Sequence, residues 1–191
     1  IPTTPISYGE AEPLLRALGG PEAPEEFQGG LDFDYHVGPG STEVNLDLDI
    51  DYRPIRVRDV VAEIPGASKP EETVLLGGHY DAWTYGAEDN TSAWSTTVEI
   101  GRVLADMAER GWRPERTITL TGWDGEEYGL LGSTEYVEQF EQALGRNAVA
   151  YINMDGVAGD EFEGSGVPAA DDLLTDVTRR VRAPRGNGSV Y

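Results

Sequence analysis

Val74-Leu75-Leu76-Gly77-Gly78-His79-Tyr80-Asp81 is an apolar run that ends on a histidine and an aspartate. A short apolar run of this kind is typical of a central β-strand. More acids follow at the ends of predicted strands or in tight loops, namely Asp89, the pair Glu126-Glu127, and Asp155. Ligands of an open α/β sheet bind at its strand ends, so we expect these side chains to gather there.

The segments that follow this run alternate between strand and helix. Apolar spacing predicts helices at 90–110, 133–144 and 170–181, and β-rich composition predicts strands at 117–123 and 148–154. A further β-rich run, 56–64, precedes the apolar run at 74–81 and ends at Pro65-Gly66. This order predicts an α/β layered sheet from residue 73 onward.

The first 50 or so residues have a different character. A short helix is predicted at 10–18, ended by Gly19-Gly20. Residues 44–52 alternate apolar and polar side chains without a break, which predicts a half-buried antiparallel strand. Its aspartates are not interpreted as a calcium loop, because the glycine of that loop's sharp turn is absent. This part is predicted to belong to a neighbouring module.

Charge and composition exclude several classes of partner. The 191-residue chain carries 35 acids against 14 Lys and Arg, a net charge of −21. Such a surface repels nucleic acid and anionic membranes; it indicates either a solvated acidic face or adaptation to salt. No apolar run approaches the roughly 20 residues of a membrane span. Cysteine is absent, and the chain starts at Ile1 without Met, so we expect the true N-terminus to lie upstream.

One histidine and several carboxylates form a donor set that suits Zn²⁺. Without a cation the carboxylates would repel one another, and a pair of divalent ions resolves this. Asp81 can orient the imidazole of His79. Of the adjacent Glu126 and Glu127, one can bind metal while the other activates water. Each signal also has a plain structural alternative: a core histidine, a solvated glutamate pair, and an N-cap role for Asp155.

The sequence resembles the glutamate carboxypeptidase II family of co-catalytic zinc exopeptidases, which includes the transferrin receptor. The motifs that carry the resemblance are 74–83, Asp89, 111–114, 123–135 and 150–155. The resemblance implies a three-layer α/β/α sandwich with a mixed, largely parallel sheet over 53–191, a partial catalytic domain. Stretches 1–6, 14–15 and 37–40 resemble the end of the family's β-rich protease-associated (apical) domain, which would occupy 1–52.

The resemblance also implies a role for each matching residue. His79 and Asp155 would hold one Zn²⁺, Glu127 would hold the second, and Asp89 would bridge both. Glu126 would be the general base acting on a metal-bound water, and Asp81 would orient His79. Glu135 and Glu138 match two acids of a structural Ca²⁺ site; the alternative is an exposed i,i+3 pair. In some relatives the bond that matches Asp89–Asn90 is cis.

Two departures from the family pattern bear on activity. The second zinc needs a terminal histidine that the family places well downstream, and the other histidine here, His36, lies in the first module. We therefore expect residues 1–191 alone to bind at most one zinc well and to turn over little peptide. Trp94 replaces a small residue of the family; it is either core packing or part of a substrate pocket.

The function expected from the resemblance is that of a zinc-dependent exopeptidase, a metallopeptidase acting on peptide or aminoacyl substrates. Aminopeptidase and glutamate-type carboxypeptidase both remain open. The alternative is a catalytically dead, receptor-like homologue of the transferrin receptor type. Relatives of this architecture are often dimers and extracytoplasmic, so the resemblance points to a homodimeric full-length parent that is secreted, periplasmic or a membrane-anchored ectodomain.

Overall fold

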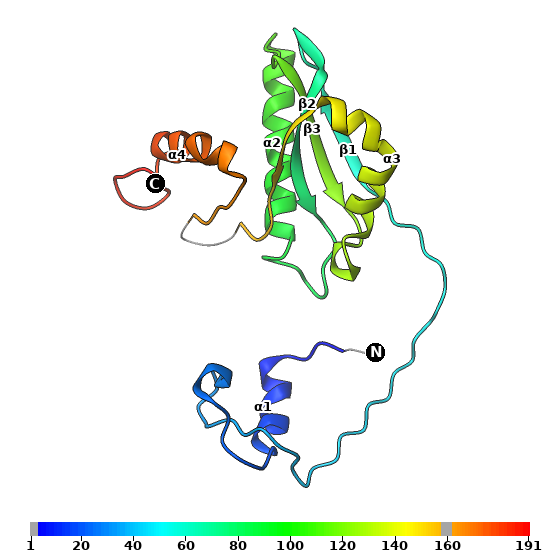
Figure 1. Cartoon of the computed structure of the whole chain (residues 1–191), viewed down its shortest axis with the longest axis vertical. Coiled ribbons are helices and arrows are strands. Elements are labelled where there is room, and N and C mark those ends of the chain that lie inside the picture. Colours follow the sequence, from blue (N-terminus) through cyan, green and yellow to red (C-terminus); the bar gives the residue numbers. More distant parts are fainter. Residues whose placement is uncertain (1–3, 158–161) are drawn as a thin grey trace. The chain divides into compact units, whose positions relative to one another are not determined.

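The computed structural model describes residues 4–157 and 162–191. The chain separates into two compact units, Ile1–Ile55 and Arg56–Tyr191, and each is described by itself (Figure 1). Among the described residues, no helix combines the length and the apolar character that a membrane crossing requires.

The second unit is built on a four-stranded mixed sheet. Its strands are β1 (Val60–Ile64), β2 (Lys69–His79), β3 (Arg116–Trp123) and β4 (Ala148–Asn153), in the order β1-β3-β2-β4. β2 runs parallel to both β3 and β4, whereas β1 is antiparallel to β3. The prediction of a mixed, largely parallel α/β sheet is confirmed. Because β2 and β4 are parallel neighbours, their carboxyl ends lie at the same edge.

Two helices cover opposite faces of this sheet. Side chains alternate along β3: a Cβ at Gly122 would collide with the ring of Trp94 on α2 (Thr91–Glu109). The next residue, Trp123, instead packs on Tyr136 of α3 (Leu131–Asn147), with ring centroids 5.0 Å apart. The sheet therefore lies between α2 and α3 (Figure 1). Trp94 packs against the sheet and the ring of Tyr80, as the core-packing interpretation expects.

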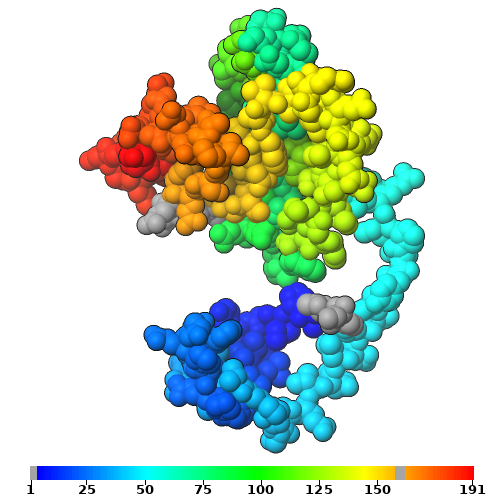
Figure 2. Space-filling model, viewed as in Figure 1, coloured from blue at the N-terminus to red at the C-terminus, as the bar shows by residue number. Residues whose placement is uncertain are grey.

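The chain continues from α3 into β4 and, after a loop, into the last helix. Figure 2 shows α3, in yellow, beside the chain that follows it on this face of the unit. A 3-10 turn, Pro168–Ala170, leads into α4 (Asp171–Arg180). Asp171 and Asp172 lie in the first turn of α4 and two arginines in its last, charges that favour both helix ends.

The first unit differs from its prediction. Helix α1 (Tyr8–Arg16) forms near the predicted place and begins with a capping box between Ser7 and Glu10. A 3-10 turn, Glu25–Phe27, follows, and Glu22 and His36 form an isolated bridge. Residues 44–52 are extended and mostly exposed, and belong to no strand. The predicted strand is wrong, because alternation selects a face but a strand also needs a hydrogen-bonded neighbour. The β-rich character expected for this part is therefore not found in its described residues.

Candidate metal centre

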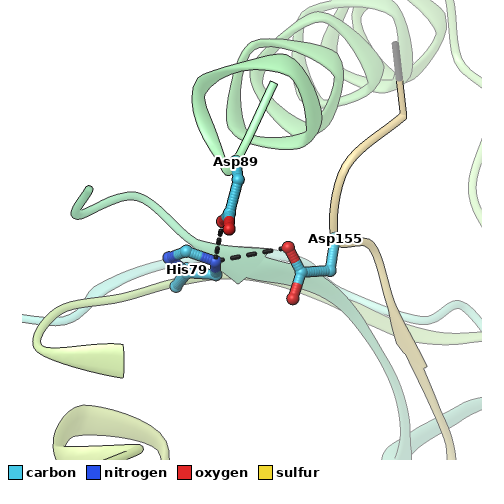
Figure 3. Close-up of side chains that lie close together, drawn as sticks. All are labelled: His79, Asp89 and Asp155. Carbon is cyan, nitrogen blue, oxygen red and sulfur yellow. Dashed lines mark hydrogen bonds and ion pairs between the residues drawn. The ribbon is translucent and has the colours of Figure 1, made fainter. Parts of the chain in front are cut away.

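Three predicted ligands converge at the carboxyl edge of the sheet. His79 is the last residue of β2, Asp155 follows β4 by two residues, and Asp89 lies in the loop before α2. Figure 3 shows the three side chains pointing toward one another. His79 Nε2 lies 3.0 Å from Asp89 Oδ1 and 3.3 Å from Asp155 Oδ1. One ligand atom from each residue fits within 4.8 Å of the others, so the group can hold one metal ion.

Burial within this triad is uneven. The His79 side chain is 3% exposed, whereas Asp89 and Asp155 are 63% and 48% exposed. The imidazole is thus fixed in the protein, and the carboxylates face solvent, from which a metal ion and a substrate would arrive.

The electrostatics of the triad favour a cation. Burial lowers the pKa of His79, but the charges of Asp155 and Glu126 and two hydrogen bonds outweigh it, so this pKa lies above its ordinary value. The metal-free cluster thus stabilises a proton on the imidazole, and a divalent cation can replace that proton. A nitrogen and two carboxylate oxygens form a donor set that zinc accepts. The residues present therefore fit the metal that the sequence predicts.

Glu126 and Glu127 lie in a 3-10 turn, Glu126–Tyr128, directly after β3. Gly125 enters this turn at φ 70°, a conformation that favours glycine. Glu126 Oε2 lies 3.9 Å from His79 Nε2. Burial raises the pKa of Glu126; His79 opposes this, while Asp155, Glu127 and Asp81 add to it, and the net pKa is raised. In the described residues Glu127 is not part of the converging group, so its role as a zinc ligand stays a prediction.

Asp81 makes more contacts than its predicted role requires. Its Oδ1 lies 3.4 Å from His79 Nδ1, while its backbone carbonyl lies closer to the same nitrogen, at 3.1 Å. The two carboxylate oxygens accept the backbone N–H groups of Glu126 and Glu127, at 3.1 and 3.2 Å. One side chain therefore contacts the histidine and holds the turn that carries both glutamates.

Glu135 and Glu138 both lie on α3 and are exposed. Neither joins a converging group of metal-binding side chains among the residues that the structure describes. This arrangement matches an exposed i,i+3 pair, and the calcium assignment stays a prediction from the resemblance.

Asn90 is a site residue that the sequence analysis missed. It is fully buried, at 0% exposure, and its side chain bonds to backbone groups of three residues around the triad: His79, Met154 and Gly156. The sequence signal was misleading, because Asn before a helix is typical of an N-cap. Asn90 occupies the N-cap position of α2 but makes no side-chain cap hydrogen bond. The peptide bond between Asp89 and Asn90 is cis.

Residues 59–189 match the family model described as peptidase family M28. The chain belongs to peptidase family M28. All the candidate zinc and catalytic residues lie inside the matched range. The resemblance to glutamate carboxypeptidase II-like proteins is confirmed by relatives named as glutamate carboxypeptidases.

Curated relatives match along the whole chain. A Zea mays protein named "Probable glutamate carboxypeptidase VP8" is 43% identical over 192 residues, which are 100% of this chain and 27% of the relative. The Caenorhabditis briggsae "Glutamate carboxypeptidase 2 homolog" is 36% identical over 204 residues, which cover 100% of this chain and 26% of the relative. "Aminopeptidase NAALADL1" of Rattus norvegicus is 35% identical over 207 residues, which cover 100% of this chain and 27% of the relative. This M28 chain thus spans about a quarter of the length of these relatives.

Among solved structures, a zinc aminopeptidase from Bacillus subtilis aligns at 26% identity with a TM-score of 0.46, covering 52% of this chain and 24% of that one. An overlap of this size adds nothing to the family assignment, which rests on the sequence matches.

Proposed function

We propose that the natural protein containing this chain is a zinc-dependent exopeptidase that hydrolyses peptide amide bonds. The observation that carries the proposal is the convergence of His79, Asp89 and Asp155 at the carboxyl edge of the sheet in an M28 chain. The relatives are named as carboxypeptidases and as an aminopeptidase. The proposal therefore extends to both kinds of exopeptidase, with a peptide or aminoacyl amide as substrate.

The proposed roles are those that the resemblance implies, and the convergence of His79, Asp89 and Asp155 supports three of them. His79 and Asp155 would hold one zinc, Glu127 would hold a second, and Asp89 would bridge the two. Bound zinc would supply a Lewis acid that polarises the scissile carbonyl and lowers the pKa of water. Because Nδ1 of His79 lies against Asp81, Nε2 is the nitrogen that would bind the metal.

Glu126 is proposed to move the proton. Its carboxylate lies beside the triad, and its raised pKa brings it closer to the range in which a carboxyl group both accepts and donates a proton near neutral pH. It would accept a proton from the attacking water and deliver it to the leaving amine. Asp81 would keep Glu126 in place through the backbone of the turn.

The experiment is to express the complete natural chain, count zinc ions per chain, and measure hydrolysis of aminoacyl amides and acyl-glutamate amides. Glu126→Gln is the control, because it keeps the shape of the side chain and removes the base. We expect two zinc ions, with kcat reduced about 10²- to 10⁴-fold in the variant. A folded protein with no zinc and no hydrolysis would contradict the proposal and support the receptor-like alternative.

Several further proposals rest on the resemblance alone. Residues 1–52 would belong to a protease-associated domain, Glu135 and Glu138 would contribute to a Ca²⁺ site, and the parent would be an extracytoplasmic homodimer. Residues 1–191 by themselves would bind at most one zinc tightly and turn over little peptide, since the remaining histidine, His36, lies in the first unit. Zinc counting and activity assays on this segment test the last point, and full turnover would contradict it.

A further inference from the structure

Asn90 is fully buried and uses both ends of its side-chain amide. Its Nδ2 donates to the carbonyl oxygens of His79, at 3.0 Å, and Met154, at 3.1 Å. Its Oδ1 accepts the N–H of Gly156, at 3.1 Å. The orientation of the amide is fixed by its partners, since two carbonyls need donors and one N–H needs an acceptor.

Each of these bonds reaches the backbone of a triad residue or of its neighbour. His79 is itself a predicted ligand, and Met154 and Gly156 flank the ligand Asp155. Asn90 directly follows the ligand Asp89. One side chain therefore links the end of β2, the segment before α2 and the segment after β4, which are the three parts of the chain that supply the triad.

Two further observations show that the amide is placed for this task. It makes no cap hydrogen bond to α2, so its bonds serve the loops and not the helix end. At Gly78, a Cβ would lie 2.9 Å from Asn90 Nδ2 and would collide with the carbonyl of Met154. The glycine before His79 thus leaves the room that the amide needs between β2 and the chain after β4.

We propose that Asn90 is the positioning residue of the metal centre: it sets the spacing of His79, Asp89 and Asp155 through their backbones without touching the metal. This proposal depends on one part of the proposed function, namely that the triad binds zinc. An unbonded buried amide or carbonyl is costly, so the side chain resists any separation of the three segments. Its loss would leave the ligands present but wrongly spaced.

The test compares Asn90→Asp with the wild type, both expressed as the complete natural chain, stripped of metal and titrated with zinc against a chelator. The substitution keeps the size of the side chain but sets a carboxyl oxygen against the two carbonyls, of His79 and Met154, that receive hydrogen bonds in the wild type. We expect zinc affinity to fall about 10- to 100-fold, as for other residues that orient ligands. The absorption spectrum of the cobalt-substituted protein should also change.

Thr97→Ala is the matched control. Thr97 is 1% exposed and lies on α2, and its hydroxyl bonds only within that helix, to Ala93. It should lower the melting temperature while leaving zinc affinity and the cobalt spectrum unchanged. The proposal would be overturned if Asn90→Asp folds and has the same zinc affinity and the same cobalt absorption spectrum as the wild type. Absence of zinc binding in the wild type would instead overturn the proposed function.

Asn90→Ser, which retains one donor, replaces Asn90→Asp if the latter does not fold. If neither variant folds, hydrogen exchange of the metal-free wild type decides the question. The proposal then expects the Gly156 amide to be protected, because Asn90 holds it before metal arrives. Exchange at the rate of an unfolded chain would overturn the proposal.

Discussion

Asp81 connects two loops of the candidate metal centre through one carboxylate. Replacing it with Asn should lower kcat/KM about 10- to 100-fold, because one N–H of Glu126 or Glu127 would lose its charged acceptor, a bond worth about 1.5–3 kcal/mol. Steady-state kinetics together with zinc content measures the effect. Asp106→Asn is the control, since Asp106 pairs with Arg102 and both side chains are exposed on α2. Unchanged kinetics in Asp81→Asn would contradict this role.

Asp59 gives the fold a pH dependence of definite sign. Burial raises its pKa above the ordinary 3.8; the N–H of Asp124 opposes this, and the charge of Asp124 adds to it. The folded chain therefore holds this proton more tightly than the unfolded chain, and stability falls as pH rises through the interval between the two pKa values. Asp59→Asn cannot lose a proton there.

As the pH rises from 4 to 7, the free energy of unfolding of Asp59→Asn should therefore increase relative to that of the wild type. Urea unfolding of both proteins in a chelator, at the two pH values, gives the difference in free energy of unfolding. If the variant's advantage in free energy of unfolding is constant with pH, or shrinks toward pH 7, the pKa of Asp59 is not raised in the folded chain.

The site residues differ in how well the sequence predicts them. His79, Asp89 and Asp155 could be predicted to converge because each follows a strand or precedes a helix, and parallel strands end at one edge. Asn90 could not, because its partners are backbone groups that no side-chain pattern reveals, two of them more than 60 residues away. The second contact of Asp81 was missed for the same reason, since Glu126 is 45 residues away.

Among the elements, the packing of α2 on the sheet depends on a glycine of β3. A side chain at Gly122 would collide with the ring of Trp94. Gly122→Ala should thus lower the free energy of unfolding by about 1–3 kcal/mol, as measured by denaturant unfolding.

Gly145→Ala provides the comparison. Gly145 lies on α3 with open space where a Cβ would lie, so alanine there should raise stability by up to about 1 kcal/mol. Equal effects of the two substitutions would show that Trp94 does not pack as described.

The elements predicted with most success are those whose periodicity and packing agree. The runs 117–123 and 148–154 form β3 and β4 almost at their predicted bounds, because each finds a hydrogen-bonded neighbour: β3 lies between β1 and β2, and β4 pairs with β2. The run 44–52 failed although its alternation is regular. Its pattern fits a half-buried strand, but in the described chain residues 44–52 pair with no strand.

For the whole molecule, zinc should act as a stabilising ligand. The metal-free triad gathers negative charge in a chain of net charge −21, and a cation that binds there would find no such cluster in the unfolded chain. At 100 times its Kd, zinc would add about 2.7 kcal/mol and raise the melting temperature of chelator-treated protein. His79→Ala should abolish the increase; an equal increase in the variant would place the stabilising metal elsewhere.

The central claim is that His79, Asp89 and Asp155 hold zinc together. The most direct test is an anomalous difference map, recorded at the zinc absorption edge from crystals of the natural protein grown with zinc. The account predicts a peak bonded to His79 Nε2 and to carboxylate oxygens of Asp89 and Asp155, at about 2.0–2.2 Å. A map with no zinc at the triad, or with zinc bound only at other residues, would contradict it.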